Sequence, residues 1–241
     1  MRILITNDDG VNAPQLVPLI RWCRKLGDVT VVVPKFEQSG KSHSIEIHKA
    51  FEAKQVALAP DITVWAVDST PADCVRFACS GLKLSFDLVI SGINRGLNLG
   101  HDIMYSGTFA AACEAVNNGI KAVALSTSIK YYDHAVEHLD NIFAYFREHG
   151  LWEQNNLYNV NIPAAPKGIR ITRQGGPYFV EDFQALENDM YLPVGKPIQT
   201  DSEDLTLDTA AHRKGFISIS PMTTDRTKGE VFRKLLVLND T

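Results

Sequence analysis

Short runs of mostly apolar residues recur along the first half of this chain, separated by stretches with a different spacing of apolar residues. The runs cover residues 3–5, 29–33, 62–67, 87–91 and 121–127. Runs that are apolar throughout, rather than alternately apolar and polar, are typical of strands that are buried on both faces of a parallel sheet. The chain is therefore predicted to contain a largely parallel sheet in this half.

The stretches between these runs carry the spacing of amphipathic helices. In the first of them Leu16, Leu19, Ile20 and Cys23 recur at i, i+3, i+4 and i+7, after Pro14 and before the breaker Gly27. Proline suits the first turn of a helix and glycine its end. Further helices are predicted from residue 71, with Thr70 as N-cap, over 108–118, ending at Gly119, and after Asp133, with Val136, Leu139, Phe143 and Phe146 on one face.

Strands that alternate with helices build parallel sheets covered on both faces. The predicted fold is therefore α/β: a Rossmann-like three-layer core with a mostly parallel sheet over about residues 1–150. Beyond it, residues 157–162, 168–172 and 216–220 have the composition of strands, whereas 175–214 is polar and rich in Gly, Pro and Asp. A long irregular segment of this kind is usually a lid or an arm that contacts another subunit. We expect one domain over 1–241, in which about 151–241 forms a β-rich C-terminal extension with an oligomerisation arm.

The composition of the chain excludes several classes of function. The hydrophobic fraction of 45% is that of an ordinary globular protein, and a formal charge of −4 gives no basic field for polymeric nucleic acid. No stretch approaches the roughly 20 apolar residues of a membrane span, and no basic leader precedes the first strand, so we expect a cytoplasmic protein. The four cysteines, Cys23, Cys74, Cys79 and Cys113, form no Cys-x-x-Cys pair and have no zinc-type histidine spacing, which favours buried, reduced thiols.

Polar clusters follow three of the predicted strands directly. They contain Asp8 and Asp9 after the first strand, Ser39 after the second, and Asn94 after the strand that begins near residue 87. Parallel strands bring such clusters to one edge of the sheet, where ligands bind in open α/β folds. Carboxylate, hydroxyl and amide oxygens are hard ligands, which suit Mg²⁺, Mn²⁺ or Ca²⁺ better than zinc. The alternative is that Asp8 and Asp9 only form a turn ahead of a helix.

The loop over residues 91–108 carries four glycines, three hydroxyls and two asparagines, and it leads into a predicted helix. A helix N-terminus presents unpaired N–H groups and the positive end of the helix dipole, so Ser106, Gly107 and Thr108 are predicted to bind phosphate, with Asn98 beside them. The alternative is that Ser106 or Thr108 merely caps the helix.

Other phosphate and nucleophile motifs are absent from the sequence. It contains no Gly-x-x-x-x-Gly-Lys-Ser/Thr loop, no Gly-x-Gly-x-x-Gly fingerprint after the first strand and no Gly-x-Ser-x-Gly elbow. The two aspartates are adjacent, so in a strand-like ending they point to opposite sides. This spacing argues against the class of phosphatase that uses one aspartate as nucleophile and a second aspartate, two residues later, as acid.

Taken together, these segments resemble the SurE (stationary-phase survival) nucleotidase family. The resemblance rests on 7–10 (Asn-Asp-Asp-Gly), 39–44 (Ser-Gly-Lys-Ser-His-Ser), 69–75, 91–100 and 105–108 (Tyr-Ser-Gly-Thr), and it continues through 159–163, 168–173 and 215–221. It spans nearly the whole chain. Three departures stand out: His101 before Asp102, Ser69 in place of glycine, and the absence of a histidine after Thr227.

The resemblance implies a metal-dependent 5′-nucleotidase that releases phosphate from nucleoside monophosphates, with 3′-monophosphates and short polyphosphates as further substrates. It implies one divalent cation per subunit, held by Asp8, Asp9, Ser39 and Asn94, with Mg²⁺ or Mn²⁺ as the working metal and Ca²⁺ as a substitute in crystals. Asp8 or Asp9 would orient or deprotonate the attacking water. It also implies a homodimer or homotetramer built by exchange of C-terminal arms. The rival hypothesis is a non-catalytic nucleotide-binding or sensing module.

Overall fold

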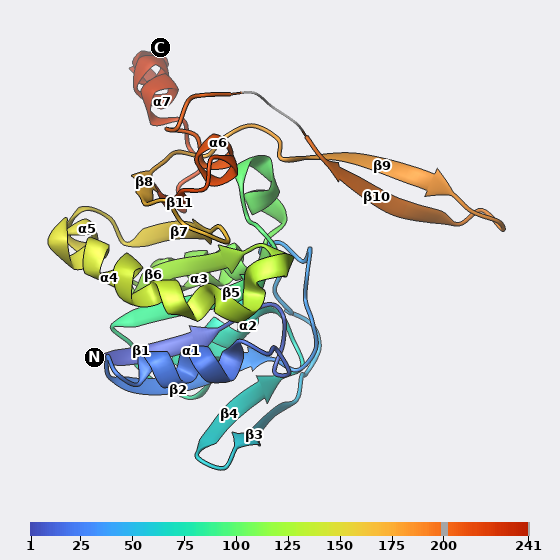
Figure 1. The fold of residues 1–241 in the computed structure, drawn as a ribbon, viewed down its shortest axis with the longest axis vertical. Coiled ribbons are helices and arrows are strands. Elements are labelled where there is room, and N and C mark those ends of the chain that lie inside the picture. The colour runs from blue at the N-terminus through green and yellow to red at the C-terminus, as the bar shows by residue number, and fades with distance from the viewer. Residues whose placement is uncertain (199–201, 241) are drawn as a thin grey trace.

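The computed structural model describes residues 1–198 and 202–240, and two hydrophobic clusters form on opposite faces of its central sheet. Neighbouring residues of one strand belong to different clusters: Ile3 and Ile5 face one, and Leu4 faces the other. This division explains why the strands are apolar at every position rather than at every second one. Burial on both faces makes the three layers (Figure 1).

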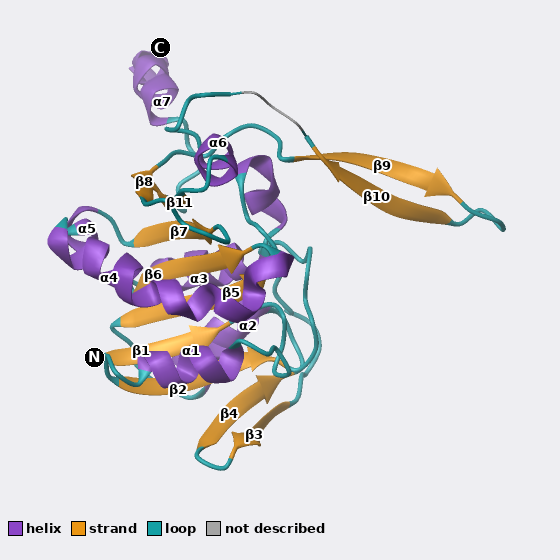
Figure 2. Ribbon diagram, in the orientation of Figure 1, coloured by secondary structure: helices purple, strands orange, loops and turns teal. Residues whose placement is uncertain are grey.

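The elements run in the order β1 (Arg2–Thr6), α1 (Leu16–Cys23), β2 (Asp28–Pro34), β3 (Ala53–Ala59), β4 (Ile62–Val67), α2 (Pro71–Arg76), η1 (Phe77–Gly81), β5 (Leu88–Arg95), η2 (Gly100–Tyr105), α3 (Gly107–Asn117), β6 (Lys121–Thr127), η3 (Ile129–His138), α4 (Leu139–Glu148), α5 (Leu151–Gln154), β7 (Leu157–Ile162), β8 (Ile169–Ile171), β9 (Phe179–Ala185), β10 (Tyr191–Pro197), α6 (Asp208–Arg213), β11 (Ile217–Pro221), α7 (Gly229–Leu235) and η4 (Leu236–Asp240). Figure 2 shows their distribution.

Within the described ranges, nine strands form one sheet in the order β3-β4-β2-β1-β5-β6-β7-β11-β8. The six strands from β4 to β7 are parallel, whereas β3 runs antiparallel to β4 and β11 runs antiparallel to β7 and parallel to β8. This confirms the α/β class with a mostly parallel sheet. The sheet continues across residue 150, and the division of the chain at that point stays a prediction.

Helices α1 and α4 pack on one face of the sheet, and α2 and α3 pack on the other (Figure 1). Helix α3 begins at an N-cap, Ser106, whose side chain accepts a hydrogen bond from the N–H of Phe109. The predicted cap at Thr70 is also present, with its side chain accepting from the N–H of Asp73. None of the helices in the described ranges is both long and apolar enough to cross a membrane.

Three sequence-based expectations need correction. The helix expected from Asp133 is preceded by the 3-10 helix η3, and the α-helix begins only at Leu139. Strand β3 was not predicted, because its burial alternates irregularly at the sheet edge. The segment 175–214, expected to be irregular, contains the antiparallel pair β9 and β10 and the helix α6.

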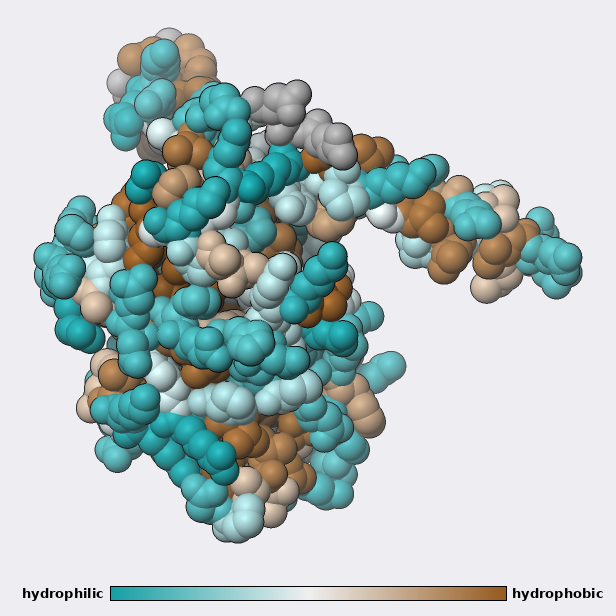
Figure 3. Space-filling view, in the orientation of Figure 1, coloured by the Kyte–Doolittle hydropathy of each residue, from teal (hydrophilic) through white to brown (hydrophobic). Residues whose placement is uncertain are grey.

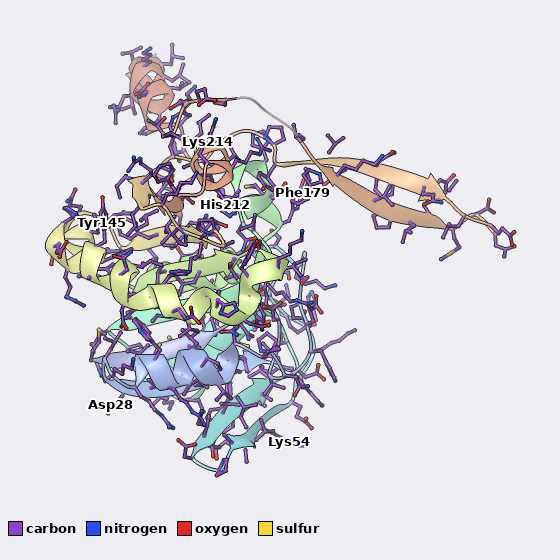
Figure 4. The ribbon with its side chains drawn as sticks, viewed as in Figure 1. Asp28, Lys54, Tyr145, Phe179, His212 and Lys214 are labelled. Carbon is purple, nitrogen blue, oxygen red and sulfur yellow. The ribbon has the colours of Figure 1, made fainter. Side chains whose placement is uncertain are left out.

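Strands β9 and β10 form a hairpin that projects away from the body of the protein (Figure 1). Phe179, where the hairpin leaves the body in Figure 4, is 39% exposed, and Phe183 and Tyr191 further out are each 62% exposed. Figure 3 shows apolar and polar side chains mixed along its whole length. An isolated two-stranded hairpin has little core of its own, so this one is stable only if something covers it.

Candidate active site

The carboxyl ends of the central parallel strands gather the three predicted clusters at one edge of the sheet. Asp8 and Asp9 follow β1, which lies between β2 and β5. The loop after β2 reaches them, because the N–H of Gln38 donates to the backbone carbonyl of Asp8 at 2.7 Å. Asn94 lies within β5 rather than beyond it, since that strand continues to Arg95. The predicted metal-binding segments are therefore neighbours.

Asp8 is buried against the first turn of α3. The Thr108 hydroxyl donates to Oδ1 of Asp8, and the Thr108 N–H donates to Oδ2 at 3.1 Å. The carboxylate is only 3% exposed, and burial raises its pKa above the ordinary value despite these two hydrogen bonds. Both oxygens of Asp8 therefore have a fixed orientation.

A glycine allows this close approach of α3 to Asp8. A Cβ built on Gly107 would lie 3.0 Å from the Asp8 Cβ and 3.1 Å from both Oδ2 of Asp8 and Cγ of Pro71. Such distances are too short for ordinary carbon contacts, so any side chain here would push the helix away from the carboxylate. Gly107 is therefore required for the contact between α3 and Asp8, and its binding of phosphate stays a prediction.

Asp9 is held differently. Its Oδ2 accepts a hydrogen bond of 2.9 Å from the backbone N–H of Arg95. Burial and, less strongly, the negative charges of Asp8 and Glu37 raise the pKa of Asp9 to about 6, although the hydrogen bond from Arg95 and its charge act in the opposite direction. The Arg95 N–H is the one donor of ordinary hydrogen-bond geometry to this carboxylate in the described part of the chain, and the Tyr132 hydroxyl also lies close enough to interact with it.

The site has an excess of negative charge. Neither Asp8 nor Asp9 forms an ion pair with a cationic side chain of the described residues. Paired carboxylates that are buried without a counter-charge are costly, so the arrangement favours a bound cation. Over the described residues no group of three or more His, Cys, Asp and Glu could hold a metal, so a cation here must take further ligands from neutral oxygens.

Asn94 and Ser39 are the neutral candidates. The Asn94 side chain is buried and donates from Nδ2 to the carbonyl of Gly96 at 3.0 Å, which leaves its Oδ1 as an acceptor for a ligand. Ser39 is exposed, and its hydroxyl donates to Glu37 at 2.7 Å. The donor set is made entirely of oxygen and fits Mg²⁺ or Mn²⁺.

Among the predicted phosphate-binding residues at the start of α3, two are already engaged in hydrogen bonds within the protein. Ser106 caps α3 through the N–H of Phe109, and the side chain and N–H of Thr108 are both bound to Asp8. In the first turn, this leaves the N–H of Gly107 directed at the site edge without a protein partner among the described residues. The capping alternative is therefore correct for Ser106, and it does not exclude a phosphate at the same helix end.

Asn98 belongs to a separate polar network. Its Nδ2 donates to the Ser126 hydroxyl at 2.8 Å, and its backbone N–H donates to Oδ1 of Asn161 at 2.9 Å. Its carbonyl accepts from the side chains of Asn159 and Asn161. These bonds hold the loop between β5 and α3 over the ends of β6 and β7, so a contact of Asn98 with phosphate stays a prediction.

Three residues near the carboxylates were missed in the sequence. Arg95 acts through its backbone N–H and Glu37 through its charge. Tyr132, in η3, is 4% exposed, and the charge of Asp9 contributes to raising its pKa. Its buried hydroxyl lies beside the Asp9 carboxylate and the backbone of Gln15, without a hydrogen bond of ordinary geometry to either. No local pattern marks any of the three, because the fold alone brings them to Asp9.

Comparison with known proteins agrees with this geometry. The family model described as "Survival protein SurE" matches residues 3–181. The chain is 38% identical over 239 residues to the 5′-nucleotidase SurE of Thermoanaerobacter sp. (strain X514), an alignment that covers 95% of this chain and 94% of that protein. It is 36% identical over 248 residues to the protein of the same name from Pelotomaculum thermopropionicum, which covers 98% and 94%. The crystal structure of the SurE protein from Aquifex aeolicus superposes with a TM-score of 0.82 at 30% identity and covers both chains completely.

Proposed function

Since this chain belongs to the SurE family, we propose that it acts as a 5′-nucleotidase whose divalent cation is held by Asp8, Asp9, Ser39 and Asn94. Relatives of near-identical length carry the name 5′-nucleotidase SurE. The observation that supports the metal site best is a pair of carboxylates without an ion-pair partner among the described residues: Asp8, buried against the first turn of α3, and the half-buried Asp9 beside it.

The charge balance also argues against a module that only binds nucleotides. A phosphate placed at the N-terminus of α3 would lie next to Asp8, whose charge would repel it. The repulsion is removed if a divalent cation lies between the two. Such a cation, when bound, polarises phosphoryl oxygens and lowers the pKa of a coordinated water. A sensing module has no need of this arrangement.

The residues of the chain have separate tasks in this proposal. The N–H of Gly107 and the dipole of α3 bind the non-bridging phosphoryl oxygens, and Asn98 fixes the loop between β5 and α3 through its bonds to Ser126 and Asn161. Thr108 holds Asp8 with two hydrogen bonds and so prevents it from turning toward the phosphate. The result is a fixed set of oxygens that does not need to rearrange during the reaction.

Asp9 is the better candidate for the general base. Both oxygens of Asp8 accept hydrogen bonds from Thr108, whereas the backbone hydrogen bond to Asp9 engages Oδ2 alone and the Tyr132 hydroxyl lies beside that carboxylate. Oδ1 of Asp9 would take the proton from the attacking water and then release it to solvent.

The test is phosphate release from a panel of nucleoside 5′-monophosphates, 3′-monophosphates and short polyphosphates, each with and without EDTA. We expect turnover of the 5′-monophosphates that stops on chelation and returns with Mg²⁺ or Mn²⁺. We also propose that 3′-monophosphates and short polyphosphates are hydrolysed. Turnover that EDTA leaves unchanged would contradict the metal site, and nucleotide binding without any turnover would favour the sensing module.

We further propose that the protein is a homodimer or homotetramer assembled by its C-terminal arms. The hairpin of β9 and β10 exposes seven large apolar side chains, at residues 179, 180, 183, 186 and 190–192, and the helix α7 exposes Val231, Phe232 and Leu235. Neither element has a core of its own in the single chain. Exchange of identical arms is a low-cost way to cover such surfaces.

A further inference from the structure

The loop between β5 and α3 connects the metal-binding end of β5 to the first turn of α3, and its residues 96–100 are attached to the protein at every second position. Three alternate N–H groups donate to fixed acceptors: that of Gly96 to the Thr127 carbonyl at 2.9 Å, that of Asn98 to Oδ1 of Asn161 at 2.9 Å, and that of Gly100 to Oδ2 of Asp208 at 3.0 Å. Alternate N–H groups of a strand point to the same side, so this spacing is that of a paired strand.

The carbonyls of the same three residues are also held by side-chain amides. The acceptor at residue 96 is bound by Asn94 at 3.0 Å, that at residue 98 by Asn159 and Asn161 at 2.8 and 2.9 Å, and that at residue 100 by Gln174 at 2.8 Å. Only the first N–H in this series pairs with a backbone carbonyl. Polar side chains therefore take the place of a neighbouring strand along the rest of the segment.

Asp208 is the one carboxylate in this set, and it comes from the C-terminal extension. It is the first residue of α6 and is fully buried. Its Oδ1 accepts from the N–H groups of Gly175 and Thr209 at 2.8 and 2.7 Å, while its Oδ2 accepts from Gly100. A buried carboxylate is costly unless it is hydrogen-bonded, and three N–H donors provide those bonds here. No step of the proposed reaction uses this group.

The packing around Gly100 leaves the loop no room to move away from Asp208. A Cβ built on Gly100 would clash with the carbonyl of Gly176 and would lie 3.1 Å from Cγ2 of Thr209. The N–H of His101 also donates to that Gly176 carbonyl, at 3.4 Å. The loop, residues 175–176 and the start of α6 are thus in direct contact.

We propose that Asp208 is a positioning residue for the phosphate site, which it serves by fixing Gly100 at the start of η2. The inference rests on the proposed nucleotidase function, which places the phosphate at the N–H of Gly107. Helix η2 leads from Gly100 directly into the first turn of α3, and Asn98 lies two residues before it. A loop that is ordered before binding loses less conformational entropy when phosphate binds. Phosphate affinity therefore depends on a carboxylate that is buried outside the site.

The test replaces this carboxylate with an amide of nearly the same shape. In Asp208→Asn the remaining oxygen still accepts from Gly175 and Thr209, whereas the amide nitrogen faces the N–H of Gly100 and cannot accept from it. We titrate the Mn²⁺-loaded protein with inorganic phosphate in a calorimeter. The Kd for phosphate should rise by about tenfold or more, since a hydrogen bond to a charged group corresponds to about 10- to 150-fold in an equilibrium constant. The Kd for Mn²⁺ should stay at the wild-type value, because other segments hold the two metal-binding aspartates.

Ala210→Gly is the matched control for stability. Ala210 is a buried residue of the same helix, and glycine there weakens the helix without removing a bond to Gly100. This variant should lower the melting temperature and leave the Kd for phosphate unchanged. An unchanged Kd in Asp208→Asn would overturn the positioning role. An equal rise of the Kd in both variants would also overturn it, because a general loosening of the extension would then explain the effect.

Hydrogen exchange of the unaltered protein tests the same role without a variant. In the absence of phosphate, we expect the amides of Gly96, Asn98 and Gly100 to exchange at least about 100-fold more slowly than in an unfolded chain. Exchange at the unfolded rate would show that the loop is not fixed beforehand and would overturn the inference. If the wild-type protein binds phosphate with Mn²⁺ but hydrolyses no nucleotide, the proposed function fails instead, and the phosphate titrations of Asp208→Asn still decide the positioning role.

Discussion

The hydrogen bond from the Thr108 hydroxyl to Asp8 offers a sharp test of how the site is built. Thr108 is fully buried, and valine has nearly the same shape without the hydroxyl. In Thr108→Val the N–H of residue 108 still donates to Oδ2, whereas Oδ1 of Asp8 loses its donor. The substitution therefore removes one charge-assisted hydrogen bond and leaves the packing of α3 in place.

The expected magnitude follows from the burial of Asp8. A hydrogen bond to a charged group contributes about 1.5–3 kcal/mol, which corresponds to about 10- to 150-fold in an equilibrium constant. Part of that loss raises the pKa of Asp8 further, because the carboxylate is already buried. We expect the affinity for Mn²⁺ near neutral pH to fall by at least about tenfold, and kcat/KM for AMP to fall with it.

The assay is calorimetric titration of Mn²⁺ into protein first stripped with EDTA, with Thr108→Ser as the matched variant that keeps the hydroxyl. The serine variant should bind Mn²⁺ nearly as well as the wild type. If Thr108→Val also binds it with wild-type affinity at an unchanged melting temperature, then Asp8 does not take part in cation binding through this geometry.

Three further predictions follow from other parts of the structure. Asp8→Asn or Asp9→Asn should lower kcat at least about 100-fold with the fold retained, since cation stabilisation contributes several kcal/mol; near-normal turnover in both would refute the assignment. Replacing residues 178–206 with a short Gly/Ser linker should shift the protein toward monomer in light scattering and leave Mn²⁺ binding intact. An unchanged oligomeric state would show that the subunit interface lies on the α/β core instead. Burial and, less strongly, the charge of Arg213 lower the pKa of His212 to about 4 (Figure 4). Because this histidine takes up its proton near pH 6.5 in the unfolded chain, the free energy of unfolding should fall by up to about 1.4 kcal/mol per pH unit as the pH is lowered from 6.5 to 4. Urea titrations of His212→Gln should lack this part of the pH dependence.

The parallel core could be predicted because its signals are local. Each strand is a mostly apolar run, each helix has its own period and breaker, and the predicted N-cap Thr70 forms the expected bond. The hairpin of β9 and β10 could not be predicted in this way, because its side chains are exposed and its sequence has no buried face to alternate with. Only its backbone pairing defines it.

In the candidate site, too, the features set by local sequence could be predicted and those set by tertiary contacts could not. The placement of Asp8 and Asp9 at the sheet edge follows from strand order, and sequence reasoning reaches it. The partners that orient them depend on tertiary contacts: the Thr108 hydroxyl lies 100 positions from Asp8 in the sequence, and the Arg95 N–H lies 86 positions from Asp9. Sequence alone therefore assigned Thr108 to phosphate, whereas the fold gives its hydroxyl to Asp8.

The most direct test of the metal site is anomalous diffraction from a crystal of the protein grown with Mn²⁺. We expect one anomalous peak per subunit between the two carboxylates, about 2.0–2.6 Å from oxygens of Asp8 and Asp9, with Asn94 and Ser39 completing the protein ligands. The metal assignment would be contradicted if the protein hydrolyses AMP only with Mn²⁺ while its crystals show the anomalous peak elsewhere and none at these carboxylates.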